Sequence, residues 1–204
     1  MQMGIINRIV NNVMGNPFLY HYMRAFLQGG IPYRSVIDSL DTNQSDLILD
    51  IGCGSSYIAQ KIKFRKYLGI DIDPKSINAA IKKNIPNTEF LVADINTYDF
   101  SKQRFDKAIL YGVLHHLNDE EAVTLLNKLS TLIGDCVVTW DSVYLSNFYV
   151  TNNLMCALDR GKHVRTAQEM TALIKKSNLT IVENRIVPCR SRLSKYILFK
   201  LAPG

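Results

Sequence analysis

Short runs of apolar and β-branched residues alternate along the chain with segments in which apolar residues recur at helical spacing. The expected strands are Leu47–Ile51, Tyr67–Ile70, Glu89–Ala93, Lys107–Leu110, Cys136–Trp140, Leu179–Val187 and Lys195–Leu201. Runs of this length, separated by helices, are typical of βαβ units, in which helices cover both faces of a mainly parallel sheet. The pattern therefore predicts an α/β fold from residue 47 onward.

Three of the helices between these strands begin with residues that cap helix N-termini. The capping residues are Asp73, Asn118 and Thr166, and the last two have a glutamate three positions later, the spacing of a capping box. We expect the helix after Asn118 to end at Gly134, because glycine commonly terminates helices.

Residues 1–46 show no strand pattern. Aromatic residues are frequent in Pro17–Leu27, and we expect one helix there and another at Tyr33–Leu40. Sheets of this kind bind ligands beyond the carboxyl ends of their strands, where an added helix can act as a cover. The sequence predicts a helical lid over residues 1–46, with Tyr20 among the substrate contacts, and a sheet domain over residues 47–204. Simple packing of the first helices on the flank of the sheet is the alternative.

Composition agrees with one soluble globular domain. The chain has 204 residues, of which 47% are hydrophobic and 21% charged. No apolar run approaches the roughly 20 residues that a membrane-spanning helix needs, and we find no secretion signal. The cysteines are far apart in sequence and form no Cys-x-x-Cys pair, which indicates reduced thiols and a cytoplasmic location rather than zinc or disulfides.

The net charge of +6 is unevenly distributed. Residues 160–204 contain ten lysines and arginines but only two acids, Glu169 and Glu183, which gives a net charge of +8 there and −2 elsewhere. Such a bias can attract acidic partners, although a solvated basic face is the commoner explanation.

The first expected strand runs into the sequence Asp50-Ile51-Gly52-Cys53-Gly54, and a helix is expected from about Ser56. Glycine is needed at such a turn because a ligand approaches the backbone closely. A dinucleotide-binding loop would have a third small residue where Tyr57 stands. Asp50 would repel a pyrophosphate but suits a ligand with an ammonium and a sulfonium group. S-adenosylmethionine carries both charges.

The next strands also end in residues suited to such a ligand. Asp71, followed by Ile72, can accept hydrogen bonds from two ribose hydroxyls. Asp94 can accept a hydrogen bond from the adenine amino group, and Ile95 can pack against the adenine ring. The fourth strand ends at Tyr111-Gly112, which should pass under the methionine half of the cofactor.

In this order and spacing, residues 47–117 resemble the successive motifs of the class I methyltransferases. The resemblance implies a Rossmann-like three-layer sandwich with a mostly parallel seven-stranded sheet, its last strand antiparallel, with extra N-terminal helices. It also implies S-adenosylmethionine as cofactor and S-adenosylhomocysteine as product. Residues 158–165 resemble, more weakly, a segment of bacterial small-molecule members. Many members have a third glycine where Ser56 stands; serine is small and could cap the helix.

The acceptor is constrained by the end of the fourth strand. The strand ends in Tyr111-Gly112-Val113 and not in an Asn-Pro-Pro-Tyr type of motif. A chain with that motif would resemble enzymes that methylate nucleobase amines or amide nitrogens. The strand tip also lacks the acid that helps to hold a divalent cation in catechol-type enzymes. We therefore expect metal-independent, in-line transfer to a small molecule, an acidic or carrier-tethered one among the candidates, with O-methylation favoured.

A general base is needed only if the acceptor must lose a proton. The candidates are His115, His116, Asp141 and His163, although histidines after the fourth strand are more often structural. Arg160 and Arg165 are the candidates for binding a carboxylate or phosphate of the acceptor.

Other functions remain open at this point. They are an RNA or protein methyltransferase, a non-catalytic cofactor-binding subunit and, least favoured, an NAD-dependent oxidoreductase, which Asp50 and Tyr57 oppose. The basic C-terminal part keeps a nucleic-acid substrate open without favouring it. The oligomeric state is not predicted.

Overall fold

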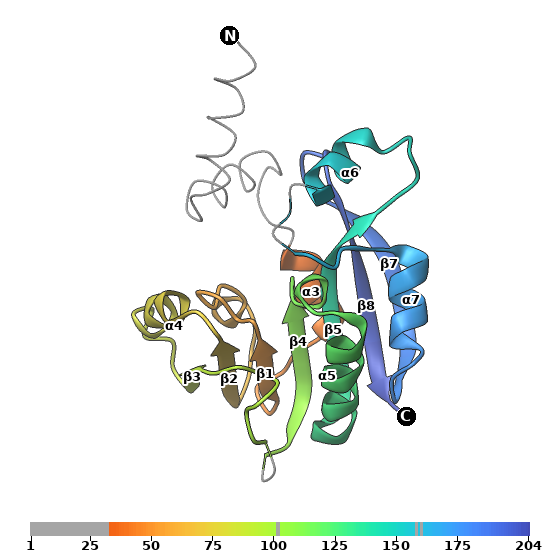
Figure 1. The fold of residues 1–204 in the computed structure, drawn as a ribbon. Coiled ribbons are helices and arrows are strands. Elements are labelled where there is room, and N and C mark those ends of the chain that lie inside the picture. Colours follow the sequence, from red (N-terminus) through yellow and green to blue (C-terminus); the bar gives the residue numbers. More distant parts are fainter. Residues whose placement is uncertain (1–32, 101–102, 158, 160) are drawn as a thin grey trace.

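The computed structural model describes residues 33–100, 103–157, 159 and 161–204 (Figure 1). The predicted helix at Pro17–Leu27, Tyr20 and Arg160 lie outside the described residues.

A mostly parallel sheet forms the centre of the molecule. Its long strands are β1 (Leu47–Ile51), β2 (Lys66–Asp71), β3 (Thr88–Val92), β4 (Phe105–Tyr111), β5 (Ile133–Tyr144), β7 (Leu179–Pro188) and β8 (Lys195–Pro203). Their order is β3-β2-β1-β4-β5-β8-β7, and β8 is antiparallel to both of its neighbours. The predicted sheet of seven strands with an antiparallel last strand is confirmed. A two-residue strand, β6 (Arg165–Thr166), also pairs with β5.

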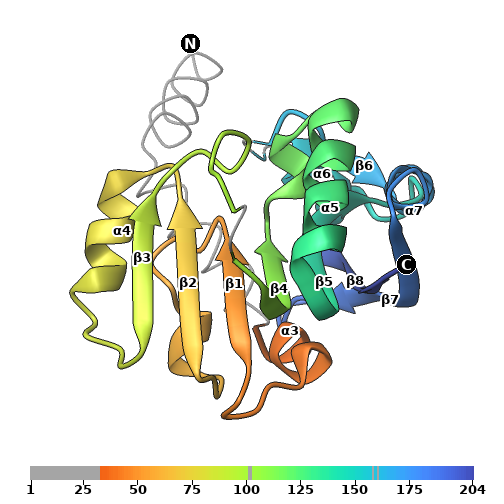
Figure 2. The same cartoon turned by 90° about the horizontal axis from the view of Figure 1, so that it is seen from below.

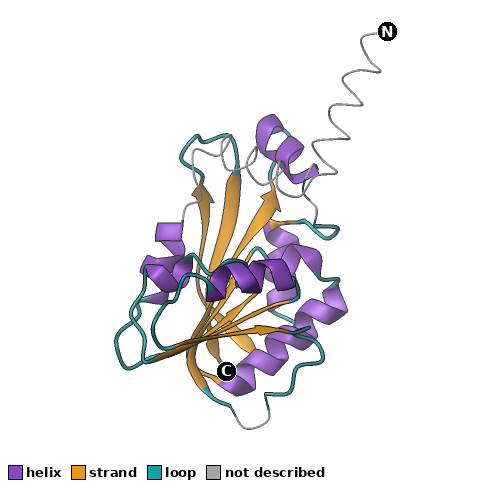
Figure 3. Ribbon diagram, turned by 90° about the vertical axis from the view of Figure 1, so that its left-hand side faces the viewer, coloured by secondary structure: helices purple, strands orange, loops and turns teal. Residues whose placement is uncertain are grey.

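Helices cover both faces of this sheet (Figure 3). They are α3 (Tyr33–Leu40), α4 (Pro74–Ile81), α5 (Asp119–Leu132), α6 (Val150–Ala157) and α7 (Ala167–Ile174), with single 3₁₀ turns η1 (Ile58–Gln60) and η2 (Leu114–His116). Helix α4 lies beside β2 and β3 at one edge (Figure 2). No helix in the described part of the chain is long and apolar enough to cross a membrane.

Alternating side chains of the strands supply two separate cores. On β1, Leu49 and Ile51 pack into the core that α5 and α7 cover. Ile48 faces the other way, toward Val36 and Leu40 of α3. Side chains of a strand point to opposite faces in turn, and the helices that cover each face present an apolar stripe to it. These two regular patterns made the strands and helices recognisable in the sequence.

The predicted helix starts are confirmed in detail. The Asp73 side chain accepts hydrogen bonds from the amides of Lys75 and Ser76, and complete capping boxes form at the other two caps, Asn118 and Thr166. The predicted stop at Gly134 is wrong. Helix α5 ends at Leu132 and the chain enters β5 at once, so that Gly134 is a strand residue.

Two expectations for the segment after the glycine loop, as we call residues 50–54, also require correction. No α-helix follows the loop; only the 3₁₀ turn η1 forms. Ser56 has a φ of +54° and therefore does not cap a helix. This left-handed conformation is one that glycine adopts without steric cost, which explains why glycine is common at this position in the family that the loop resembles.

Helix α3 packs on the sheet. Val36 and Leu40 are fully buried against the sheet, and the helix contacts β5 and β8. This part of residues 1–46 thus packs on the flank of the sheet, the alternative to a lid. The division into a helical lid over residues 1–46 and a sheet domain over residues 47–204 stays a prediction, because residues 1–32 lie outside the described residues.

Candidate active site

The glycine loop bends sharply between β1 and η1. Gly52 and Gly54 have φ values of +67° and +54°. The amides of Gly52 and Cys53 donate hydrogen bonds to the carbonyl of Ile70, at 2.8 and 3.1 Å, which fastens the loop to β2. A β-carbon on Gly52 would lie 2.8 Å from Val113 Cγ2, whereas at Gly54 no described atom lies within 4 Å of that position. Gly52 is therefore needed for packing, and Gly54 borders open space.

Asp71 at the end of β2 braces this loop. Its Oδ2 accepts a hydrogen bond from the Gly54 amide and its Oδ1 accepts one from the Asp73 amide, both at 2.8 Å. Each carboxylate oxygen keeps a second lone pair for a ribose hydroxyl. The bracing role was not predicted. The neighbouring Ile72 exposes 71% of its surface and offers an apolar face beside the loop.

Asp50 lies in β1 beside Gly69 of β2 and Ile109 of β4, and only 2% of its surface is exposed. The Tyr67 hydroxyl donates a hydrogen bond to its Oδ2. Its Oδ1 is buried and has no hydrogen-bond partner among the described residues. Burial raises the pKa of Asp50 to about 7; the Tyr67 hydrogen bond lowers it and the Asp71 charge raises it further. A buried carboxylate with an unused oxygen is suited to a cationic ligand.

Cys53 contributes a neutral thiol to the same loop. The cysteine is buried, and burial, together with the charges of Asp50 and Asp71, raises the pKa of its thiol. Its proposed cofactor contact is consistent with apolar packing rather than with a charged group.

Asp94 and Ile95 follow β3. Asp94 is exposed, and its Oδ1 accepts a hydrogen bond from the Asn96 amide at 2.9 Å, which shapes the turn after the strand. Ile95 is half-buried and packs against the core beneath the sheet edge. The structure thus places both residues at the carboxyl edge, and their contacts with adenine stay a prediction.

A row of stacked aromatic rings runs along the same edge. Tyr33 stacks on Tyr57 and on Tyr111, with ring centroids 4.4 and 5.1 Å apart. Tyr111 stacks in turn on Trp140 at 4.3 Å, and Trp140 on Tyr196 at 3.6 Å. Burial, followed by the nearby Tyr57 and Asp50, raises the pKa of Tyr33 to about 12. The rings therefore form a rigid, uncharged wall beside the glycine loop, joining α3 to β4, β5 and β8.

Gly112 reverses the chain directly after Tyr111. Its φ is +70°, and its amide donates a hydrogen bond to the Trp140 carbonyl at 2.7 Å. This turn brings the 3₁₀ segment η2, with His115, over the end of β5.

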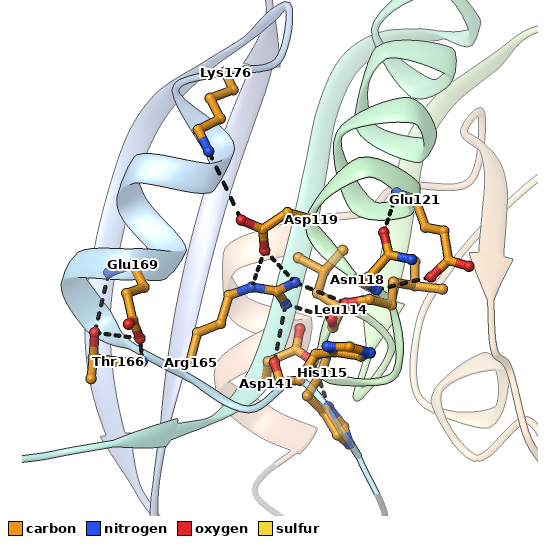
Figure 4. A network of polar contacts seen from close by, with 12 residues as sticks. Leu114, His115, Asn118, Asp119, Glu121, Asp141, Arg165, Thr166, Glu169 and Lys176 are labelled. Atoms are coloured by element: carbon orange, nitrogen blue, oxygen red, sulfur yellow. Dashed lines mark hydrogen bonds and ion pairs between the residues drawn. The ribbon is translucent and has the colours of Figure 1, made fainter.

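His115 is clamped between two aspartates (Figure 4 shows it with Asp141). Its Nδ1 lies 2.7 Å from Asp141 Oδ1, and the same oxygen accepts a hydrogen bond from the His115 amide. Its Nε2 lies 3.5 Å from Asp159 Oδ1. Burial alone would lower the pKa of His115, but the hydrogen bonds to both carboxylates outweigh it and raise the pKa to about 9. At neutral pH the ring is an imidazolium with both nitrogens occupied, which argues against its predicted use as a base.

The other predicted bases differ in position. Asp141 lies inside β5, not after it, and is buried in its pairing with His115. His163 is half-buried, and its amide donates a hydrogen bond to the His115 carbonyl at 3.0 Å. His116 is exposed, with its ring 4.2 Å from that of His115. His116 and His163 stay candidates, whereas Asp141 has the role of orienting His115.

The segment that follows α6 packs tightly on this histidine. A β-carbon on Gly161 would lie 2.0 Å from the His115 ring and 2.7 Å from its carbonyl oxygen. Asp159, whose Oδ2 accepts a hydrogen bond from the Ser142 hydroxyl at 2.9 Å, was not predicted as a site residue. Its partners lie 17 and 44 positions away in sequence, which no local pattern reveals.

Arg165, predicted to bind the acceptor, instead has partners for all five of its donor N–H groups (Figure 4). Its Nε and Nη2 donate to Asp119 Oδ1 at 3.0 and 2.8 Å. The remaining donors reach the carbonyl oxygens of Leu114, Leu117 and His163 at 2.8 to 3.1 Å. The buried guanidinium therefore joins β6 to η2 and α5, and this geometry favours a structural role.

Replacing Arg165 with alanine is expected to lower the free energy of unfolding by about 2–4 kcal/mol, because three carbonyl oxygens lose a charged donor. Chemical denaturation measures this change. The matched control is Lys176→Ala, which removes an exposed lysine 3.9 Å from the same Asp119 and should change stability by less than about 0.5 kcal/mol. Unchanged stability with weakened acceptor binding would restore the role predicted from the sequence.

Several known proteins similar to this chain are methyltransferases. Residues 48–134 match the family model described as methyltransferase domain. A Mycobacterium tuberculosis protein described as an uncharacterized methyltransferase is 28% identical over 155 residues, which cover 71% of this chain and 76% of that protein.

Solved structures share the whole fold. The N-methyltransferase NodS from Bradyrhizobium japonicum, crystallised with S-adenosylhomocysteine, has a TM-score of 0.68 at 17% identity, covering 97% of each chain. Magnesium protoporphyrin IX methyltransferase from Synechocystis, with the same molecule bound, has a TM-score of 0.67 at 18% identity, covering 93% of this chain and 88% of that one.

Residues 48–134 are therefore a methyltransferase domain, and the fold around it is the one shared with solved class I, Rossmann-like S-adenosylmethionine-dependent methyltransferases. The family resemblance seen in residues 47–117 is thereby confirmed. The bacterial small-molecule type, the acceptor and the individual site residues stay predictions.

Proposed function

We propose that this chain transfers the methyl group of S-adenosylmethionine to a small-molecule acceptor, with oxygen as the favoured acceptor atom. The observation that carries the proposal is the buried Asp50 carboxylate, whose Oδ1 has no hydrogen-bond partner among the described residues. An ammonium group would supply both the missing donor and the compensating charge. A pyrophosphate would add a second anion beside Asp50, which argues against a nicotinamide dinucleotide.

The remaining cofactor contacts follow from the order of the strand ends. Gly52, Cys53 and Gly54 would lie along the methionine and ribose portions, because Gly54 borders open space. Asp71 would bind the ribose hydroxyls, with Ile72 beside it. Asp94 and Ile95 would contact adenine at the end of β3, and Tyr111 with Gly112 would lie under the sulfonium.

The bound cofactor supplies an activated methyl group, and this chain contributes position and shelter. The Tyr33–Tyr111–Trp140 stack would form a wall that excludes water and orients an acceptor in line with the methyl–sulfur bond. The His115 imidazolium stiffens the end of β4 and carries its proton at neutral pH. If a proton must leave the acceptor, His163 or the exposed His116 is better placed to receive it.

The acceptor itself is assigned by class only. Replacement of Asn-Pro-Pro-Tyr by Tyr111-Gly112-Val113 favours oxygen over nucleobase or amide nitrogen. Since Arg165 is engaged within the chain, an acidic or carrier-tethered acceptor would depend on Arg160, which lies outside the described residues. NodS is named as an N-methyltransferase and the Synechocystis enzyme as a magnesium protoporphyrin IX methyltransferase, although both share this fold. The fold alone therefore does not determine the acceptor.

The test is a transfer assay with cofactor carrying a labelled methyl group, offered separately to pooled small metabolites, carrier-bound acids and RNA. We expect label in the small-molecule or carrier-bound fraction and calorimetric binding of S-adenosylmethionine but not NAD. Label confined to RNA, with binding that weakens steeply in salt, would instead assign a nucleic-acid substrate. Tight cofactor binding without transfer to any pool would indicate a non-catalytic subunit.

A further inference from the structure

Helix α6 buries a polar residue and exposes two large apolar ones. Its polar Asn152 faces inward, is almost fully buried and donates a hydrogen bond to the Val143 carbonyl at 2.8 Å. Its apolar Val150 and Leu154, one turn apart, face outward with 69% and 57% of their surfaces exposed. Phe148, just before the helix, is 95% exposed. Single exposed apolar residues are common, but three within seven residues mark an interaction surface.

The turn between β7 and β8 adjoins this helix and is basic. The Lys195 amide donates a hydrogen bond to Asn152 Oδ1 at 2.6 Å, and Lys195 Nζ lies 3.8 Å from the centre of the Tyr149 ring. Arg190 and Arg192 are exposed at the tip of the turn, next to the partly exposed Leu193. Neither residues 144–157 nor residues 186–195 contain an aspartate or glutamate. The surface thus combines protruding apolar groups with cations and has no acid of its own.

We propose that this surface, called here the α6 patch and formed by Phe148, Val150, Leu154, Arg190, Arg192 and Leu193, docks on an anionic lipid bilayer. A bilayer accepts protruding apolar side chains without a complementary groove, and its anionic headgroups attract the flanking arginines. A protein partner would need a concave surface shaped to this helix. Vesicle binding is independent of methyl transfer, so the proposal stands apart from the proposed function.

Docking through the α6 patch would also orient the candidate active site. Strand β5 carries Trp140 and Asp141 and ends at Tyr144, four residues before Phe148. Helix α6 and the carboxyl ends of β1 and β4 lie toward the same end of the molecule (Figure 1). The edge that holds the candidate site would therefore lie near the bilayer, where an acceptor dissolved in lipid could reach it.

The experiment is vesicle flotation of the full chain at about 0.1 M salt. Vesicles of phosphatidylcholine with about 30% phosphatidylglycerol should bind the protein, whereas vesicles of phosphatidylcholine alone should not. The double variant Arg190→Gln/Arg192→Gln should bind about 25-fold more weakly, at roughly fivefold for each cation lost. Phe148→Ala/Leu154→Ser should weaken binding at least about tenfold, because both inserted apolar groups are removed.

The matched controls carry the same kinds of change elsewhere on the surface. Val182→Ser removes an exposed apolar side chain of β7, and Lys63→Gln/Lys82→Gln removes two exposed cations near the opposite edge of the sheet. Both should bind anionic vesicles like the unaltered chain. The proposal is overturned if the unaltered chain binds neither vesicle, binds both equally, or binds as well after either change to the α6 patch. Light scattering that shows Phe148-dependent dimers in place of vesicle binding would assign the surface to a second copy.

Discussion

Asp50→Asn is expected to weaken S-adenosylmethionine binding by at least about 100-fold while making the cofactor-free protein more stable. The carboxylate is buried, and its Oδ1 lacks a partner among the residues that the structure describes. Loss of a buried charge-assisted hydrogen bond to an ammonium costs about 3 kcal/mol or more, which corresponds to this loss of affinity. Without cofactor the same charge is a burden, because nothing in the described chain neutralises it.

The pH dependence follows from the raised pKa of Asp50. The pKa is about 7 in the folded chain, against an ordinary value of 3.8, so the folded state favours the protonated acid. The contribution of Asp50 to the free energy of unfolding is fully present below about pH 4 and is lost as the pH rises through 7. Asparagine removes that loss, so the variant should gain up to about 4 kcal/mol above pH 7, less the cost of the new amide. Cofactor affinity of the unaltered chain should fall below pH 7 as Asp50 becomes protonated.

Calorimetry with S-adenosylmethionine and denaturation between pH 5 and pH 8.5 measure both effects. The control is Asp38→Asn, which neutralises an exposed carboxylate on α3 and should leave cofactor affinity unchanged. Full affinity in Asp50→Asn would remove the assignment of Asp50 to the cofactor ammonium, whatever happened to stability.

Most of the fold was accessible from local sequence because its periodic signals are strong. Strand β1 alternates between two cores, and the caps at Asp73, Asn118 and Thr166 act over three residues. Helix α6 was missed because its buried side includes the polar Asn152 while Val150 and Leu154 are exposed, which departs from the pattern that indicates a surface helix. Strand β6 is too short to produce any pattern.

Some residues of the candidate site could likewise be predicted from local sequence, and others could not. Asp50, Asp71 and Asp94 were found because they follow strand runs, and parallel strands bring their carboxyl ends to one edge. The partners of these residues could not be found, since they depend on contacts between distant segments. Tyr67 is such a partner, and so is the aromatic stack. Arg165 looked like a surface cation in a basic segment, and only the fold shows that its charge is used within the chain.

His115→Leu is expected to lower the free energy of unfolding by about 3–5 kcal/mol. The Asp141 and Asp159 side chains are 1% and 2% exposed, and both would lose the imidazolium between them. Removing one partner of a buried ion pair leaves the other charges uncompensated, which costs more than the pair itself contributes. Denaturation at pH 6.5 measures the loss. His116→Leu is the matched control, because the adjacent ring is exposed and its removal should change stability by less than about 1 kcal/mol.

A pH series separates this structural role from catalysis. The His115 pKa is about 9 in the folded chain, against an ordinary value of 6.5. Its contribution is therefore fully present below pH 6.5 and lost as the pH rises through 9, on the order of 3 kcal/mol in total. His115→Leu should lack this decline between pH 6.5 and 9. A catalytic base would behave differently: its removal would leave stability and its pH profile unchanged and abolish turnover, and that result would return His115 to the role predicted from sequence.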